Sequence, residues 1–277
     1  MGGRYGAFTF CDRITDYVPA RRARAAFAVP TALDCFSPCL VAEATGQLAA
    51  WVAMAHIGFR GRPVAALAHD VCLDSVVRPG EVLLLTVEIE ECNDANVFYQ
   101  GQARVGERSV VRLIDCLGPM LPQDEYDAPD DLAREFALLC GEGEVPGRFE
   151  GVGAHAMETT AAAAGTRSAL LHIPADAPYF VDHFPRRPVF PATLLLDHAI
   201  RVAGQLVDGD TPGAHRASRV TNVKMRGFIR PGENVLLKTT RVTSDDDAPR
   251  VKLIAMVGER KMATAQITFA RVDQEAA

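Results

Sequence analysis

The sequence predicts an α+β protein of two similar halves, each with one long apolar helix followed by antiparallel strands. The tetrapeptide Arg-Pro-Gly-Glu occurs at residues 78–81 and again at 230–233, and a strand-like run follows each copy. An apolar helical segment precedes each copy at a similar distance, 35 residues from Glu43 in the first half and 33 residues from Asp197 in the second. The shared order of parts indicates an internal repeat.

The two helical segments, residues 40–55 and 192–206, are almost entirely apolar, which is typical of helices buried on most sides. Pro191 stands where the second helix is expected to begin. Glu43 is the only charged residue of the first segment. Because an unpaired buried carboxylate is costly, Glu43 is expected either to cap or pair within the helix or to serve a function.

Alternation of apolar and polar residues predicts strands with one buried face. The expected strands are residues 82–89, 96–105 and 108–117 in the first half, and 234–242, 250–257 and 260–271 in the second. An acidic, proline-containing stretch separates the two sets and indicates a linker with one short helix over 131–140. The predicted organisation is a first domain over 1–121, a linker over 122–153 and a second domain over 154–277.

Composition excludes several classes of function. A net charge of −6 and a pI of about 5.7 argue against a nucleic-acid or anionic-membrane partner. Without an apolar run of about twenty residues or a signal-peptide core, the chain is expected to be cytoplasmic. The seven cysteines form no Cys-x-x-Cys pair, and the histidines form no His-x-x-x-His pair. We therefore expect reduced thiols, no metal site and no nucleotide-binding loop.

The stretch from Tyr179 to Pro191 carries the chemistry. Its three prolines restrict the backbone around His183 and present the imidazole on a stiff loop directly before a helix. Asp197 follows 14 residues later in an otherwise apolar run. A histidine and an acid near a helix N-terminus predict an acid–base site beside backbone N–H groups that stabilise negative charge.

The string His183-Phe-Pro-x-x-Pro-Val-Phe-Pro, with an acid at Asp197, resembles the active-site loop of the β-hydroxyacyl-acyl-carrier-protein dehydratases of fatty-acid synthesis. That family has the hotdog fold, a long helix wrapped by a curved antiparallel sheet, so the resemblance implies a double hotdog. Two residues depart from the family pattern. Phe190 replaces a methionine, and Ala192 replaces the glycine whose amide holds the thioester carbonyl, although alanine still offers its N–H.

The resemblance is divided unequally between the halves. Residues 10–14 and 43–47 resemble the family's N-terminal and helix segments, but no histidine lies between Val29 and the first helix. In the family, the histidine of one protomer faces the acid of the other. Carried onto this chain, that arrangement pairs His183 with Glu43, supported by Gln47, and leaves Asp197 as a remnant paired with Arg201. A pairing of His183 with Asp197 on the same segment stays open.

The resemblance implies that water is removed from a 3-hydroxyacyl thioester without a cofactor. His183 would be the base, Glu43 the acid and the Ala192 amide the oxyanion donor, with Pro188 and Phe190 in support. The substrate would be carried on phosphopantetheine, as an acyl-carrier-protein or coenzyme A thioester. The basic segment 224–230, with Arg186 and Arg187, is a candidate contact for that carrier. A hotdog thioesterase and a non-catalytic acyl-binding subunit are the alternatives; acyl chain length, a fatty-acid or polyketide pathway, and a homodimer of double hotdogs stay open.

Overall fold

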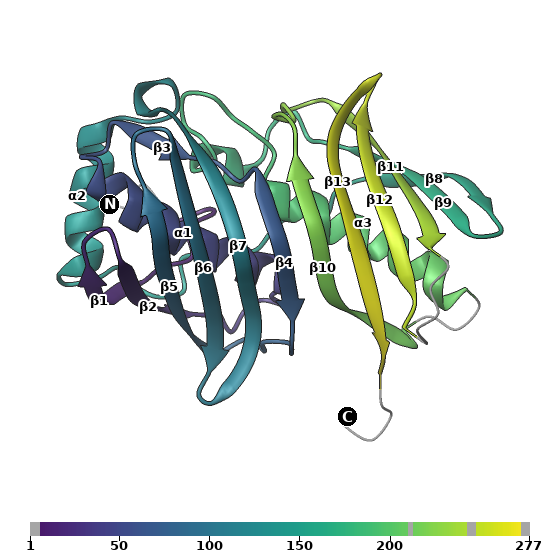
Figure 1. The fold of residues 1–277 in the computed structure, drawn as a ribbon, viewed down its shortest axis with the longest axis horizontal. Coiled ribbons are helices and arrows are strands. Elements are labelled where there is room, and N and C mark those ends of the chain that lie inside the picture. Colours follow the sequence, from purple (N-terminus) through teal and green to yellow (C-terminus); the bar gives the residue numbers. More distant parts are fainter. Residues whose placement is uncertain (1–5, 210–212, 243–247, 273–277) are drawn as a thin grey trace.

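A computed structural model describes residues 6–209, 213–242 and 248–272. Two long helices, α1 (Pro38–His56) and α3 (Ala192–Asp208), lie against the same side of one large antiparallel sheet (Figure 1). The predicted α+β class is confirmed, with one helix packed under each half of the sheet. No helix within the described ranges combines the length and apolar character needed to cross a bilayer.

The described strands form a single sheet of 13 strands in the order β1-β2-β5-β6-β7-β4-β10-β13-β12-β11-β9-β8, with β3 paired to β7. The second half of this order repeats the first half in reverse, as a pseudo-twofold axis between β4 and β10 requires. The first half contains β1 (Arg13–Val18), β2 (Arg22–Ala28), β3 (Gly61–Pro63), β4 (Leu67–Leu73), β5 (Val82–Cys92), β6 (Asn96–Val105) and β7 (Arg108–Pro122). The second half contains β8 (Met157–Ala163), β9 (Thr166–His172), β10 (His215–Met225), β11 (Asn234–Val242), β12 (Arg250–Val257) and β13 (Arg260–Arg271).

The predicted strands 96–105, 234–242, 250–257 and 260–271 are confirmed residue for residue. The other two continue beyond their predicted ends, β5 to Cys92 and β7 to Pro122. The added part of β7 pairs with the short strand β3, a partner that the alternation pattern alone does not reveal.

The segment between the halves contains the 3-10 helix η1 (Gln123–Glu125) and the helix α2 (Pro129–Cys140). Helix α2 packs its apolar face on the first half, where the ring of Phe136 lies 5.2 Å from Tyr17 and 6.2 Å from Trp51. The boundaries of the two domains and the linker stay a prediction. Another 3-10 helix, η2 (Pro178–Val181), precedes the His183 loop.

Helix α1 begins where its sequence provides a cap. The Ser37 hydroxyl accepts the N–H of Leu40 at 3.3 Å, and Pro38 occupies the first turn, where its missing N–H costs nothing. Eleven of its side chains are buried, namely Cys39, Leu40, Val41, Ala44, Thr45, Leu48, Ala49, Trp51, Val52, Ala53 and Met54. Burial on this scale explains why the segment tolerates a single acid, Glu43.

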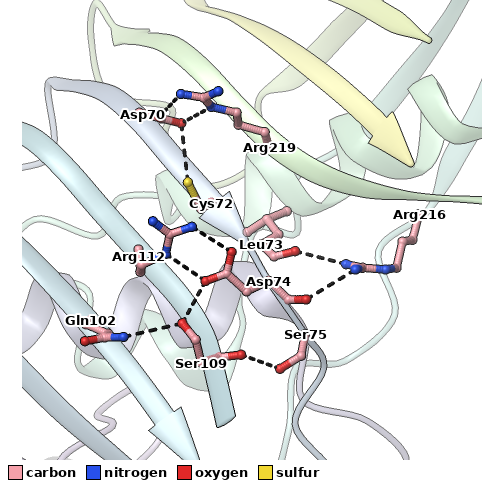
Figure 2. A network of polar contacts seen from close by, with 10 residues as sticks. All are labelled: Asp70, Cys72, Leu73, Asp74, Ser75, Gln102, Ser109, Arg112, Arg216 and Arg219. Carbon is pink, nitrogen blue, oxygen red and sulfur yellow. Dashed lines mark hydrogen bonds and ion pairs between the residues drawn. The ribbon is translucent and has the colours of Figure 1, made fainter. Parts of the chain in front are cut away.

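The two halves are joined by antiparallel pairing of β4 with β10, in which Cys72 lies opposite Arg219 and Asp70 opposite Thr221. The buried carboxylate of Asp70 accepts the Nε–H of Arg219 at 2.8 Å and also pairs with its Nη2 (Figure 2). These hydrogen bonds to Arg219 lower the pKa of Asp70 below its usual range. The junction is therefore a continuous ladder with a charged clamp across it.

A second network supports the same junction from the first half (Figure 2). The carboxylate of Asp74, just after β4, accepts hydrogen bonds from Arg112 at 2.8 and 3.0 Å and from the Ser109 hydroxyl at 2.7 Å. Arg216 of β10 donates to the carbonyl of Leu73 at 2.9 Å. The C-terminal end of β4 is thus fixed to both of its neighbouring strands, β7 and β10.

We expect Arg219→Met to lower the free energy of unfolding by about 1–3 kcal/mol, because it leaves the buried Asp70 carboxylate without its donor. In the folded protein the pKa of Asp70 lies below its ordinary value of about 3.9. The difference in the free energy of unfolding between the variant and the wild type should therefore be complete above about pH 3.9 and disappear as the pH falls through the folded pKa. Urea unfolding monitored by circular dichroism measures it. Arg60→Met, which breaks the exposed pair with Asp94, is the control and should cost about 0–1 kcal/mol. Equal losses in the two variants would contradict a special role for the junction.

Candidate active site

His183 is held by backbone hydrogen bonds on both sides of its loop. Its N–H donates to the carbonyl of Tyr179 in η2 at 2.9 Å, and its carbonyl accepts the N–H of Val189 at 2.9 Å. The peptide bond between His183 and Phe184 is cis. The loop thus turns back on itself within the segment that the sequence predicts to be stiff.

The imidazole of His183 is oriented by one further hydrogen bond. Its Nδ1 lies 2.8 Å from the carbonyl oxygen of Val189. Because a carbonyl only accepts, Nδ1 carries the proton of the neutral ring, and Nε2 is left with its lone pair. A histidine fixed in this tautomer is suited to accept a proton at Nε2.

Glu43, on α1 of the other half, reaches the same place through two hydrogen bonds. Its Oε1 accepts from Nε2 of Gln47 at 3.0 Å, and its Oε2 lies 2.7 Å from the hydroxyl of Thr193 on α3. Gln47 is fixed in turn by the N-terminal segment, since it donates to the carbonyl of Phe8 at 2.9 Å and accepts the N–H of Phe10 at 3.0 Å. The acid is therefore held by both halves of the chain.

The start of α3 completes the group. Ala192 is the first residue of the helix, where N–H groups have no partner within the helix. Phe190, two residues earlier, is buried and donates its N–H to the carbonyl of Ile229 at 2.8 Å. Pro188 lies exposed at the outer turn of the loop. The helix N-terminus and its partial positive charge thus face the site.

These residues line one cavity of about 440 Å³ whose wall is largely apolar. His183, Glu43, Gln47, Ala192 and Thr193 all contribute to it. From there the cavity follows one face of α1, lined by Ala42, Gly46, Ala50, Trp51 and Met54. At about 1.5 Å per residue, this face runs for roughly 18 Å from Ala42 to Met54. A polar end and an apolar channel of this length suit a chain-like substrate with one reactive end.

The cavity also sets the charge of His183. Burial lowers the pKa of the imidazole, while the carboxylate of Glu43 raises it and Arg62 adds to the lowering. Burial is the larger effect, so the pKa lies below its ordinary value and the ring is neutral at neutral pH. The carboxylate of Glu43 is thus the negative charge that opposes the effect of burial on His183.

Asp182, which precedes His183, connects the loop to the N-terminal segment. Its buried carboxylate accepts the N–H of Phe8 at 2.7 Å, and burial raises its pKa above the usual range. The ring of Phe8 packs edge-on against His183 at 5.7 Å between centroids. The segment that fixes Gln47 therefore also covers His183.

Asp197 lies in different surroundings. Its carboxylate pairs with Arg201, one turn along α3, at 2.7 Å, as expected from the i, i+4 spacing. Asp197 is not among the residues that line the cavity. Cys39 and Thr193 are equivalent in the two halves, because Cys39 lies four residues before Glu43 and Thr193 lies four residues before Asp197. Burial raises the pKa of the Cys39 thiol well above its ordinary value. At the place related to the Glu43 site by the pseudo-twofold axis, Cys39 therefore stands where the Glu43 site has Thr193.

Two histidines that the sequence gives no reason to connect meet beside that place. Nδ1 of His155 lies 2.8 Å from Nε2 of His198, and Nε2 of His155 lies 2.9 Å from the Tyr179 hydroxyl. Burial lowers the pKa of both rings, that of His198 to about 3. The neutral pair forms a hydrogen-bonded chain that ends at Tyr179, whose carbonyl holds the N–H of His183.

The first half lacks a counterpart of the His183 loop because its connection to the helix is shorter, not because a histidine has been replaced. Val29 and Ile173 are equivalent, because each donates its N–H to the glutamate of an Arg-Pro-Gly-Glu turn, Glu81 or Glu233. Ser37, the residue before α1, lies eight residues after Val29. Pro191, the residue before α3, lies eighteen residues after Ile173. The first half therefore has no room for a second histidine loop.

Comparisons with known proteins agree with the loop and the fold. Residues 159–264 match the model of the ApeI-like family, described as ApeI dehydratase. Over 98 residues, or 35% of its length, the chain is 32% identical to the 3-hydroxyacyl-[acyl-carrier-protein] dehydratase FabZ of Protochlamydia amoebophila. The resemblance to these dehydratases is confirmed. The matched region spans 64% of this enzyme and 63% of FabZ from Pediococcus pentosaceus, less than two thirds of either relative.

Solved structures extend the likeness to nearly the whole chain. A MaoC-like dehydratase is similar over 92% of this chain and 98% of its own, with a TM-score of 0.54 and 11% identity. The 12:0-ACP thioesterase from Umbellularia californica is similar over 91% of this chain and 94% of its own, with a TM-score of 0.55 and 11% identity. At this identity the likeness establishes the hotdog-type fold alone.

Sequence reasoning identified His183, Glu43, Gln47 and Ala192, and the structure brings all four to one cavity. It missed Thr193, whose hydroxyl contacts Glu43 across 150 residues of sequence. A polar residue in the first turn of an apolar helix was the available signal. Within the described residues, no group of three or more His, Cys, Asp or Glu side chains is arranged to hold a metal ion.

We expect Glu43→Gln to lower the pKa of His183 further, because it removes the negative charge that opposes the effect of burial. Titration of the His183 Cε1–H resonance by NMR measures the shift. Asp197→Asn is the matched control and should leave this pKa unchanged. A shift in Asp197→Asn without one in Glu43→Gln would favour the pairing of His183 with Asp197 on the same segment.

Proposed function

We propose that this chain removes water from a 3-hydroxyacyl thioester to give a 2-enoyl thioester, with His183 as the base and Glu43 as the acid. The observation that carries the proposal is the shared cavity. One half supplies an imidazole with a free Nε2, the other supplies a carboxyl group, and a helix N-terminus and an apolar channel lie beside them. The dehydratase family match over residues 159–264 supports the same chemistry.

In the proposed reaction, Nε2 of His183 removes a proton from C2 of the substrate. The electron pair of that C–H bond forms the C2–C3 double bond as the C3–O bond breaks. The low pKa of His183 keeps Nε2 unprotonated at neutral pH, so the base is ready before substrate binds. The reaction changes no oxidation state and needs no cofactor.

In the reacting form Glu43 carries a proton on Oε2; the departing hydroxyl takes this proton and leaves as water, and Glu43 becomes the carboxylate that faces the protonated His183. The amide of Gln47 can only donate to Oε1, so the proton of the acid form belongs on Oε2. The Thr193 hydroxyl lies beside Oε2 of Glu43 and can either donate or accept a hydrogen bond. It can therefore donate to the carboxylate form of Glu43 and accept from the protonated form. Return of the proton from His183 to Glu43 resets the pair.

Negative charge develops on the thioester oxygen while the proton leaves C2. The free N–H of Ala192 at the start of α3 is the donor suited to that charge, aided by the helix dipole. Because the donor is a backbone group, replacement of glycine by Ala192 keeps it. The added methyl group narrows the approach of the thioester.

The carrier would bind near the outer turn of the loop. A second cavity of about 450 Å³ there is lined by Arg186, Arg187, Arg230 and Arg260, next to Phe228. Arg187 and Arg260 are paired with Glu125 and Glu233, which reduces the net charge. The predicted basic strand 224–230 leaves β10 at Met225, so its last residues form a loop at this cavity. This supports a phosphate-bearing or acidic carrier, as the name of the FabZ relatives also suggests.

We expect His183→Ala to lower dehydration of a 3-hydroxyacyl thioester by about 100- to 10,000-fold. Glu43→Gln should lose activity on a similar scale, and Asp197→Asn is the control that should keep it. An assay that follows both the ultraviolet absorbance of the enoyl thioester and the release of free thiol separates dehydration from hydrolysis. Thiol release alone from the wild type would favour the thioesterase alternative, and neither activity would favour the non-catalytic subunit.

The pH dependence follows from the same assignment. Protonation of His183 removes the base, so kcat/KM should fall as the pH drops through the His183 pKa. Because burial places that pKa below the ordinary value of about 6.5, activity should stay on its plateau down to below that pH. A pH–rate profile from about pH 4 to about pH 9 measures this dependence. A loss of activity that begins above about pH 6.5 as the pH is lowered would contradict a buried, neutral His183.

We expect Ala50→Phe to reduce activity on long acyl chains while leaving short ones largely unaffected. Ala50 lines the channel about two turns beyond Glu43, so a ring there blocks the channel past the reacting carbons. The measurement is kcat/KM over a series of acyl chain lengths. Gln205→Phe adds the same ring at an exposed position of α3 and serves as the control. An equal loss for all chain lengths would argue against this path for the acyl chain.

A further inference from the structure

The segment that joins the two halves packs against the His183 loop instead of crossing open surface. Residues 123–127, here called the joining segment, follow β7 directly. The N–H of Gln123 donates to the carbonyl of Arg60 at 3.1 Å, which ties the segment to the first half. Tyr126 within it is almost completely buried, with 1% of its surface exposed.

The joining segment holds the tip of the loop by four polar contacts. The backbone N–H of Arg186 donates to the carbonyl of Tyr126 at 3.0 Å, and its Nη1 donates to the carbonyl of Asp124 at 2.7 Å. Nη1 of Arg187 donates to Glu125 at 2.7 Å and to the Tyr126 hydroxyl at 3.2 Å. Two of these four contacts use backbone carbonyls, so they depend on the path of the segment rather than on its side chains.

An apolar contact continues from the joining segment to the imidazole. The ring of Tyr126 packs edge-on against Phe184 at 5.4 Å, and Phe184 stacks on His183 at 4.1 Å with 24° between the planes. Tyr126, Phe184 and Val189 form a small buried cluster of their own, separate from the main core. Val189 is also the residue whose carbonyl fixes Nδ1 of His183. Two of the contacts that hold the imidazole, the stacking of Phe184 and the hydrogen bond to Val189, therefore rest on Tyr126.

We propose that the joining segment is a clamp that positions His183, so that the connection between the halves is a working part of the site. This inference rests on the proposed function for its effect on the rate, but its structural part is independent of it. The loop from Asp182 to Pro191 has no regular secondary structure, and its tip contacts the joining segment. Tyr126 is accordingly a positioning residue that acts through Phe184 and Val189.

The first test compares Tyr126→Leu with Tyr126→Phe. We expect Tyr126→Leu to lower kcat by about 10- to 100-fold with a smaller change in KM, because a displaced base slows the chemical step. Tyr126→Phe keeps the ring and should retain most of the activity. Phe269→Leu, at a buried residue of β13 in the main core, controls for the loss of a buried aromatic ring. A loss in Phe269→Leu as large as that in Tyr126→Leu, at equal thermal stability, would overturn the proposal.

The second test does not depend on activity. A loosened loop admits water to His183, so in Tyr126→Leu its pKa should rise toward the ordinary value, measured by NMR. The bond between Arg186 and Arg187 should also become open to trypsin, which the intact mass of the products reveals. If both readouts match the wild type, the clamp is refuted. If both change while the wild type shows no dehydration, the clamp stands and the proposed function fails.

Discussion

The antiparallel pairing of β4 with β10 is the constraint on which the rest of the molecule depends. It makes two half-sheets into one and fixes α1 beside α3, so that Thr193 reaches Glu43. Because both halves belong to one chain, the pairing has only the entropy cost of closing a loop. Two separate molecules would instead lose translational and rotational entropy on association. The Asp70–Arg219 pair adds a charged contact across the same seam. A site divided between two halves needs such a fixed seam.

The apolar lining of the cavity accounts for two properties of the site, namely its fit to an acyl chain and the low pKa of His183. An apolar channel along α1 is required to hold an acyl chain, and it removes water from around His183. The loss of water lowers the pKa of the imidazole, and Glu43 offsets part of the effect. In the proposed reaction, the channel both receives the substrate and keeps the base unprotonated. A wetter site would bind the chain less well and carry a weaker base at low pH.

Much of the fold could be predicted from the sequence because its signals are local. Alternation gave several strands to the residue, as in 96–105, and apolar runs gave both helices. The His183 loop was also local, since its prolines and aromatic residues lie together. What could not be predicted depends on contacts between distant segments. Thr193 reaches Glu43, and Tyr126 reaches Phe184, only once the sheet has closed. No periodicity within a segment encodes such contacts.

The inequality of the two halves then follows from the requirement that buried polar groups find partners. With a short connection after Val29, no histidine loop exists to face Asp197, and that carboxylate pairs with Arg201 instead. His155 and His198, buried near it, bond to each other and to Tyr179. Tyr179 in turn holds the backbone of His183. The polar groups near Asp197 thus form a hydrogen-bonded chain, entirely within the second half, that reaches the backbone of the His183 loop.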